Sequence, residues 1–208
     1  MKDSTVVSQQ TMPATTVLPS RDILPDELHT PRLLVRVARP GDGVVFNRAI
    51  SESLDRLRPW LAWVTPAPTP AESEFSCRRA YARLLLNEDL MAFFFLKDTG
   101  QLVGGSGLHN AKWDLRQFEV GYWGHSAYAG QGLICEGVRA LVQYSLVELR
   151  ASRVFLTTDE MNIASRRLAE KVGFQLEGTL RHERRNLQGG FRNTCVYAVL
   201  GIEGEARP

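Results

Sequence analysis

One stretch decides the fold of this chain, and it reads Glu119-Val-Gly-Tyr-Trp-Gly-His-Ser-Ala-Tyr-Ala-Gly-Gln-Gly-Leu-Ile-Cys-Glu-Gly-Val138. Its apolar start predicts a strand at 117–123, and apolar residues at helical spacing predict a helix at 130–149. The turn between them carries Gly130 and Gly132. Glycines allow an anion to approach the free N–H groups at a helix start, where the helix dipole also attracts negative charge. The stretch therefore predicts a phosphate-binding turn.

Two glycines alone are a weak signal, because helix starts and turns often use glycine only for backbone freedom. No Gly-Lys-Ser/Thr closes this turn, so it is not a P-loop. It also lacks the Gly-x-Gly-x-x-Gly fingerprint of dinucleotide-binding proteins. Both nucleotide-binding classes are therefore disfavoured, and the surrounding sequence has to identify the ligand.

The sequence on either side of the turn predicts a mixed sheet with helices. Before the turn, we expect strands at 33–37, 90–96, 101–108 and 117–123, and helices at 44–53, 55–63 and 71–87. After it, we expect helices at 130–149 and 162–172, and strands at 153–158, 174–181 and 194–200. Short turns join the strands from 90 to 123, which predicts an antiparallel meander. The later strand-helix-strand order implies a crossover and a parallel pair.

The fold class that follows is α+β, with a mixed, mostly antiparallel sheet of about seven strands flanked by helices. Residues 29–201 are expected to form a single domain, because 208 residues with 44% apolar content can bury one substantial core. Residues 1–28 are rich in Ser, Thr, Pro and Val without periodicity, which predicts a flexible N-terminal arm. Residues 202–208 are assigned to a C-terminal tail.

The composition disfavours several function classes. The formal net charge is only +2, whereas nucleic-acid binders usually show a clustered basic excess, so no nucleic-acid partner is expected. No apolar run approaches the ~20 residues needed to cross a bilayer, and no secretory signal is evident, so no membrane partner is expected. Cys77, Cys135 and Cys195 have neither metal-ligand nor disulfide spacing. This pattern predicts packing roles for the cysteines, no metal and a cytoplasmic location.

A second block follows the turn at a short interval and reads Asn162-Ile-Ala-Ser-Arg-Arg-Leu-Ala-Glu-Lys-Val-Gly-Phe174. Together the two blocks resemble motifs A and B of the GNAT superfamily of N-acetyltransferases. The motifs Glu-Val-Gly-Tyr-Trp, Gly-Gln-Gly, Asn-x-x-Ser and Gly-Phe-x-x-Glu-Gly are similar to the branch that acetylates N-termini of ribosomal proteins. That branch is also matched by Thr30-Pro-Arg-Leu33, Arg58-Pro-Trp60 and Gly190-Phe-Arg-Asn-Thr-Cys-Val-Tyr197. The resemblance covers residues 29–200 and implies a GNAT-like twisted sheet, with acetyl-CoA as cosubstrate and no metal.

The resemblance also implies where CoA binds. In that family the glycine-rich turn holds the CoA pyrophosphate, and a splay between the fourth and fifth expected strands admits the pantetheine arm. The implied cofactor-binding residues are Tyr122 and Trp123 through their backbone, Asn162 through its side chain, and Ala129, Gly130, Gln131, Gly132, Leu133 and Ile134 in the turn. Ala129 departs from the usual Arg or Gln, and Ile134 departs from a small residue. Backbone donors remain, but a side-chain contact is lost at Ala129.

Acetyl transfer to an amine needs a neutral nitrogen, donors for the developing oxyanion and a proton for the departing thiolate. The family commonly has a glutamate at Glu119, which makes this residue the candidate base, with Glu177 as the second candidate. Many family members use a tyrosine as the acid, but this chain has Ala169 there, so Ser165 is the candidate acid. The alternatives are a solvated strand glutamate and a helix serine that bonds its own backbone.

Two further reactive side chains near the turn are assigned no chemistry. His125 has no Asp-His-Ser or Cys-His set around it, which favours an ordinary loop histidine. Cys135 lies in the expected cofactor helix, where packing explains it more simply than covalent catalysis does.

The acceptor side is expected to come from the early helices and the last hairpin. The candidate substrate residues are Trp60, Trp63 and Arg184, with Arg181, His182, Arg185 and Arg192 nearby in sequence. They predict aromatic walls and a basic rim for an acidic peptide N-terminus. Alternatively, the tryptophans belong to the core and the arginines to a solvated hairpin.

Three acceptor hypotheses stay open. The first acceptor is a protein N-terminus, such as that of a ribosomal protein, whose α-amino pKa of ~8 demands a weaker base than a lysine or polyamine near ~10.4. The second is a small-molecule amine, such as an antibiotic, polyamine or amino-acid derivative. The third hypothesis is a CoA-binding module without turnover. A homodimer is kept as a further partner hypothesis.

Overall fold

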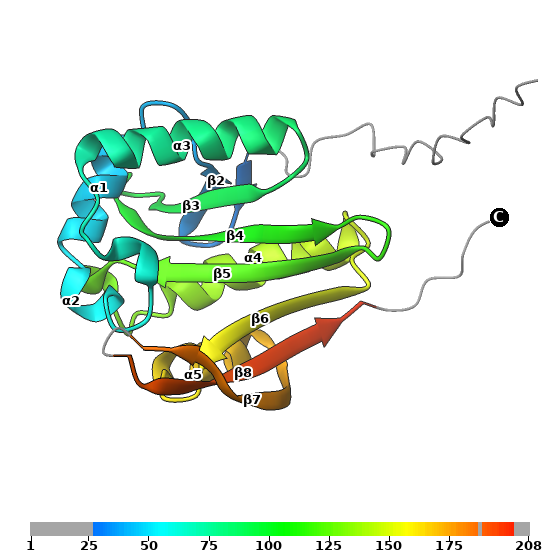
Figure 1. The fold of residues 1–208 in the computed structure, drawn as a ribbon. Helices are drawn as coiled ribbons and strands as arrows, with labels where there is room; N and C mark the ends of the chain where they lie inside the picture. Colours follow the sequence, from blue (N-terminus) through cyan, green and yellow to red (C-terminus); the bar gives the residue numbers. More distant parts are fainter. Residues whose placement is uncertain (1–26, 187–188, 202–208) are drawn as a thin grey trace, which may run out of the picture.

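The computed structural model describes residues 27–186 and 189–201, which form one sheet flanked by helices (Figure 1). The strands are β1 (Glu27–His29), β2 (Leu33–Val37), β3 (Leu90–Leu96), β4 (Leu102–Lys112), β5 (Gln117–Gly124), β6 (Arg153–Asp159), β7 (Gln175–Arg185) and β8 (Phe191–Leu200). The α-helices are α1 (Gly43–Ser51), α2 (Leu54–Leu57), α3 (Pro70–Leu85), α4 (Leu133–Val147) and α5 (Ile163–Val172). Two short 3₁₀ turns are η1 (Ala62–Val64) and η2 (Ser126–Tyr128).

The sheet has the strand order β1-β2-β3-β4-β5-β6-β8-β7. Strands β3, β4 and β5 form the predicted antiparallel meander, and β5 pairs with β6 in parallel after the chain has crossed through α4. Every other neighbouring pair is antiparallel. The mixed, mostly antiparallel α+β fold is therefore confirmed.

The sheet has eight strands in the described residues, one more than the sequence predicted. The additional strand β1 pairs Glu27 with Arg36 and His29 with Leu34 on β2. Its first two residues had been assigned to the N-terminal arm, because three residues are too few to show a strand period. The rest of the arm, residues 1–26, and the tail, residues 202–208, lie outside the described residues.

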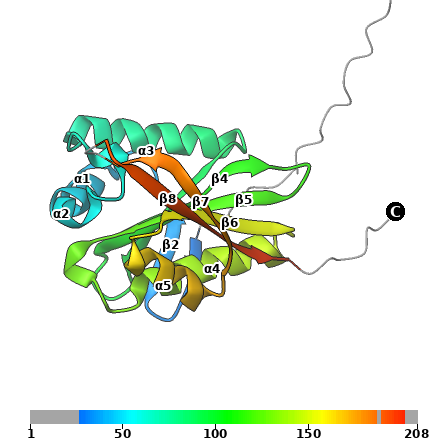
Figure 2. The same ribbon diagram turned by 60° about the horizontal axis from the view of Figure 1, so that its bottom comes forward.

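Helices cover both faces of the sheet (Figure 2). On one face, α4 and α5 enclose a core that includes Phe94, Leu141 and Tyr197. On the other, α1 to α3 enclose a second core that includes Phe46 and Trp123. Among the described helices, none is both long and apolar enough to cross a lipid bilayer.

The helix ends follow local sequence signals. The side chain of Thr69 accepts a hydrogen bond from the Glu72 N–H, Glu72 bonds back to the Thr69 N–H, and Pro70 occupies the first helical position of α3. The helix expected at 55–63 is wrong, because α2 ends at Leu57 and only η1 follows. Pro59 lacks an N–H group, so it cannot donate the hydrogen bond that would extend the helix beyond Arg58.

Helix α4 begins at Leu133 rather than at the expected residue 130. Gly130 and Gly132 have φ angles of 79° and 76°, in the left-handed region that glycine adopts without a steric penalty. These two residues therefore shape a turn that leads into the helix instead of forming its first residues.

Candidate active site

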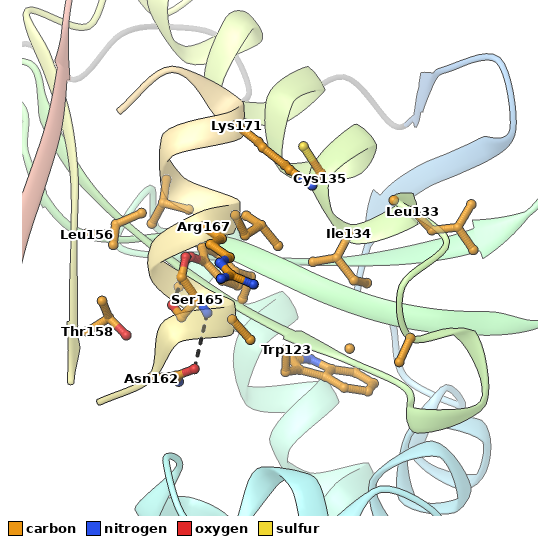
Figure 3. Close-up of a pocket in the computed structure, with 18 of the residues that line it drawn as sticks. Trp123, Leu133, Ile134, Cys135, Leu156, Thr158, Asn162, Ser165, Arg167 and Lys171 are labelled. Carbon is orange, nitrogen blue, oxygen red and sulfur yellow. Dashed lines mark hydrogen bonds between the residues drawn. The ribbon is translucent and has the colours of Figure 1, made fainter. Parts of the chain in front are cut away.

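A cavity of about 1140 Å³ opens where β5 and β6 separate (Figure 3). The parallel pairing of these strands ends at Glu119 and Phe155. Beyond that point, Val120 to Trp123 line the cavity on one side, and Leu156 to Asp159 line it on the other. Backbone groups of β5 that face β6 thus have no strand partner there, and an extended ligand can bind them. The splay predicted between these strands is present in the structure.

The glycine-rich turn lies at one end of this cavity, with Ala129, Gly130, Gly132, Leu133 and Ile134 in the lining. Gly132 is the N-cap of α4 and makes no side-chain capping bond. The first N–H groups of a helix have no partner within the helix, so here they are available to a ligand. This arrangement suits a phosphate group, because the N–H groups and the helix dipole both favour an anion.

The bulky Ile134 fits this turn because two glycines lie beneath it. A Cβ atom added to Gly104 would lie 2.4 Å from the Ile134 Cδ1, and one added to Gly124 would lie 3.0 Å from its Cγ1. Ile134 therefore occupies volume that side chains on β4 and β5 would otherwise fill. The glycines at these two positions thus make room for a larger side chain at Ile134.

The side chain of Arg32, from the segment between β1 and β2, lies against the same turn. Its Nη1 donates to the Gln131 carbonyl over 3.0 Å, and its Nε donates to the Glu136 carboxylate over 2.7 Å. Burial raises the pKa of Glu136, but hydrogen bonds from Thr30 and Arg32 outweigh this and lower it. Glu136 is therefore held ionised within the first turn of α4. Gln131 itself does not line the cavity and contributes its carbonyl to Arg32 instead.

Asn162 and Ser165 meet at the start of α5, opposite the turn (Figure 3). The Asn162 Oδ1 accepts a hydrogen bond from the Ser165 N–H over 3.1 Å and thereby caps the helix. The Tyr122 hydroxyl reaches across from β5 to the Ser165 carbonyl at 2.9 Å and lies 3.0 Å from the Ser165 hydroxyl. Burial raises the pKa of Tyr122 to about 12. This phenol therefore stays protonated near neutral pH.

Glu119 does not line the cavity itself but is hydrogen-bonded to a residue that does. Its carboxylate accepts from Asn110 Nδ2 over 2.7 Å and from Thr157 Oγ1 over 3.2 Å. Thr157 lines the cavity, whereas Glu119 does not. The second candidate base, Glu177, forms an ion pair with Arg153 and is also absent from the lining. Thr157 is thus the nearest link between Glu119 and the space where the strands separate.

Of the three predicted substrate residues, two line the main cavity and one does not. Trp60 and Arg184 line the main cavity, and the guanidinium of Arg192 lies 5.8 Å from the centre of the Trp60 ring. Trp63 is half exposed, packs beside Phe46 at a ring distance of 6.1 Å, and is not among the residues that line the main cavity. A second cavity of about 650 Å³ shares Trp60, Asp159 and Arg192 with the first.

His125 and Cys135 also line the main cavity. His125 Nδ1 accepts from the Ala127 N–H over 3.2 Å, and its Nε2 lies 2.9 Å from Glu52. The histidine thus caps η2 and links it to the end of α1, which matches the loop role expected from sequence. Cys135 is partly buried in the first turn of α4, and all three cysteines are free thiols.

The charge of the lining is predominantly positive. Seven lining residues are Arg or Lys, namely Arg32, Arg56, Arg139, Arg167, Lys171, Arg184 and Arg192, and the two acidic ones are Glu136 and Asp159. Both carboxylates are paired with arginines. Such a lining favours an anionic ligand with several phosphates. No cluster that could hold a metal ion occurs in residues 27–186 and 189–201.

Several of these cations were missed by the sequence interpretation. Arg167 and Lys171 are four residues apart, a spacing that places them on the same face of α5 and was a usable signal. Arg32 belongs to the Thr30-Pro-Arg-Leu33 motif, but its contact with a turn some hundred residues later had no local signal.

Comparison with known proteins shows the family to which the chain is related. Residues 32–175 match the family described as acetyltransferase (GNAT) domain. The Bacillus subtilis protein named "Putative ribosomal N-acetyltransferase YdaF" is 29% identical over 177 residues, covering 83% of this chain and 93% of that protein.

Solved structures of the same fold have lower sequence identity. The ribosomal L7/L12 α-N-protein acetyltransferase RimL in complex with coenzyme A superposes with a TM-score of 0.78 at 17% identity, covering 84% of this chain and 97% of that one. The ribosomal-protein-S5-alanine acetyltransferase of Vibrio fischeri gives 0.76 at 16% identity, covering 86% and 99%.

Proposed function

Because this chain belongs to the GNAT family of acetyl-CoA-dependent acetyltransferases, we propose that it moves the acetyl group of acetyl-CoA directly onto the α-amino group of a protein N-terminus. The relatives named above as acetyltransferases of ribosomal proteins make such a protein the first acceptor to test. A cytoplasmic location and a single-domain unit at residues 29–201 belong to the same proposal.

The observation that carries the proposal is the continuity of the phosphate turn with the separated strands in one cavity. A CoA molecule with its diphosphate at the turn has its pantetheine arm directed along Val120 to Trp123. The arm then passes Asn162, and the thioester lies near Ser165 and Thr157. Under this proposal the predicted cofactor residues on the turn, on β5 and on α5 bind successive parts of CoA, with the exception of Gln131, which does not line the cavity.

The chemistry proceeds by direct attack of a neutral amine on the thioester carbonyl. The new C–N bond forms, the amine loses a proton, and the C–S bond breaks to release the CoA thiolate. Ser165 is the proposed donor of a proton to the thiolate, and its hydroxyl recovers a proton from solvent. Glu119 is the proposed final acceptor of the amine proton. Because Glu119 does not line the cavity, the proton passes through Thr157 or a water.

A peptide fits the acceptor side better than a compact amine does. Trp60, Asp159 and Arg192 line both cavities, so the second cavity lies next to the space proposed for the reacting amine. An N-terminal residue can occupy the first, and the following residues can pass Trp60 into the second. The rim cations Arg56 and Arg184 favour acidic side chains on the acceptor. A small amine leaves the second cavity without a role.

The test is an acetyl-CoA assay that follows release of free CoA thiol. Peptides with free N-termini, the same peptides with blocked N-termini, and small amines are compared. We expect thiol release only with free N-termini, with the acetyl group located on the α-amine by mass spectrometry. Release with small amines but not with peptides would replace the proposed acceptor with the second hypothesis.

Substitution of Trp60 sharpens this assay. We expect Trp60→Ala to raise the KM for peptides severalfold while leaving the KM for acetyl-CoA unchanged. The matched control is Phe75→Ala, since Phe75 is exposed on α3 and does not line either cavity. Equal effects of the two substitutions would argue against a peptide path across Trp60.

A further inference from the structure

Ala129 leaves the phosphate turn without the side-chain contact that an arginine or glutamine would offer there. Arg32 occupies the space beside this turn, although it lies in a different part of the sequence. Its Nη2 would be 3.7 Å from a Cβ atom added to Gly132, so the guanidinium stands directly over the turn. Its side chain is half exposed and lines the cavity.

The guanidinium is fixed in place by three contacts. Nε and Nη2 each lie 2.7 Å from Glu136 Oε2, and Nη1 donates to the Gln131 carbonyl over 3.0 Å. Glu136 is itself held by the Thr30 hydroxyl at 2.6 Å and the Arg32 N–H at 2.9 Å. A side chain fixed in this way loses little conformational entropy when a ligand binds.

These contacts occupy at most three of the five N–H groups of the guanidinium, namely the Nε group and one each on Nη1 and Nη2. One N–H on Nη1 and one on Nη2 remain without a partner in the described residues. The same contacts neutralise the Glu136 carboxylate, which would otherwise repel an anion at the start of α4. Arginine donates two parallel N–H groups to phosphate oxygens more effectively than lysine does.

We propose that Arg32 is a cofactor-binding residue that presents its two free N–H groups to the diphosphate of acetyl-CoA and replaces the contact missing at Ala129. This inference rests on the proposed binding of acetyl-CoA at the turn. It adds Arg32 as the residue that supplies positive charge beside the turn. Backbone amides of the turn and the Arg32 side chain then both donate hydrogen bonds to the diphosphate.

The first experiment is Arg32→Ala, assayed with two acetyl donors. With acetyl-CoA we expect the KM to rise about tenfold to a hundredfold, the effect of losing a charged hydrogen-bonding group, while kcat at saturation changes little. With S-acetylpantetheine, which has no diphosphate, we expect the same KM for wild type and variant. An unchanged KM for acetyl-CoA would overturn the proposal.

The second experiment separates direct contact from neutralisation of Glu136. The double variant Arg32→Ala with Glu136→Gln removes both charges. If Arg32 binds the diphosphate, the double variant keeps the raised KM for acetyl-CoA. Full recovery of the KM in the double variant would show that Arg32 acts only by screening Glu136, which would also overturn the proposal.

The matched control is Arg36→Ala. Arg36 on β2 makes a two-pronged ion pair with Asp42, with both contacts at 2.7 Å, outside the cavity. This substitution should lower the thermal midpoint without changing the KM for acetyl-CoA. Isothermal titration with CoA distinguishes the two levels of inference: no binding by the wild type would refute the proposed function, whereas equal binding by wild type and Arg32→Ala would refute only the role of Arg32.

Discussion

The Tyr122 hydroxyl lies 3.0 Å from the Ser165 hydroxyl across the gap between β5 and α5. One residue comes from a strand that lines the cavity, and the other from a helix that lines its opposite side. Tyr122 also contacts the Ser165 carbonyl, so its hydroxyl fixes both the side chain and the backbone of the candidate acid.

This relationship predicts the behaviour of two substitutions. Ser165→Ala should lower kcat about tenfold to a thousandfold, the usual contribution of a general acid or base. Tyr122→Phe should lower kcat by a smaller factor, and adding it to Ser165→Ala should cause no further loss, because the two hydroxyls act as a unit. Steady-state kinetics of both single variants and the double variant measure this. If the two losses in kcat multiplied in the double variant, the two hydroxyls would act independently and this prediction would be wrong.

The position of Glu119 behind Thr157 predicts a pH-dependent defect. Glu119→Gln should reduce kcat/KM about tenfold to a hundredfold at low pH, where the amine is protonated and needs a base. The defect should shrink as pH rises and free amine accumulates. Thr157→Val should produce part of the same change if the threonine hydroxyl links Glu119 to the cavity.

The control for this profile is Glu88→Gln, since Glu88 is a surface carboxylate near Arg83 and does not line the cavity. A pH profile of Glu119→Gln that runs parallel to the wild type would reject Glu119 as the base.

The lowered pKa of Glu136 predicts a pH dependence of stability. Because its folded pKa lies below the ordinary value of ~4.3, the ionised carboxylate stabilises the fold above that value. The stabilisation is lost as pH falls through the lowered pKa. Glu136→Gln should therefore be less stable at neutral pH, by about 1–2 kcal/mol, and should lose less stability on acidification below pH ~5. Chemical denaturation at a series of pH values measures both effects, and parallel curves would be inconsistent with this role.

Gly137 is predicted to be intolerant of a side chain. A Cβ atom at this position of α4 would lie 2.6 Å from the ring of Phe94 on β3. Gly137→Ala should therefore lower the free energy of unfolding by about 1–3 kcal/mol, as overpacking usually does. Phe94→Leu in the same chain should recover part of the loss by making room. A Gly137→Ala variant as stable as the wild type would show that α4 can move away from the sheet at little cost.

The cysteines are predicted to differ in reactivity. Cys77 and Cys195 are buried, and burial raises the pKa of Cys77 to about 12. Cys135 is partly exposed in the cavity, so a thiol reagent should label this single cysteine in the native protein. CoA should slow the labelling by occupying the cavity, and Cys135→Ala should abolish it. Labelling that CoA leaves unaffected would place the cofactor away from Cys135.

The sequence alone determined the features that depend on neighbouring residues. Alternating apolar runs gave the meander, and the strand-helix-strand order gave the parallel pair of β5 and β6. The positions of Gly130, Gly132 and Asn162 predicted the turn before α4 and the start of α5. Each of these signals acts over a few residues, because backbone conformation and helix capping are local.

Only the tertiary structure decided which side chains meet in the cavity. It brought Arg32 onto the Gln131 carbonyl, placed the hydroxyl of Tyr122 beside Ser165, and set Glu119 behind Thr157. It also kept Trp63 out of the main cavity. These contacts join segments that are distant in sequence, so they depend on strand order, register and the angle at which β5 and β6 part. A local pattern in the chain carries no information about such distances, because they are fixed only when the whole sheet has packed.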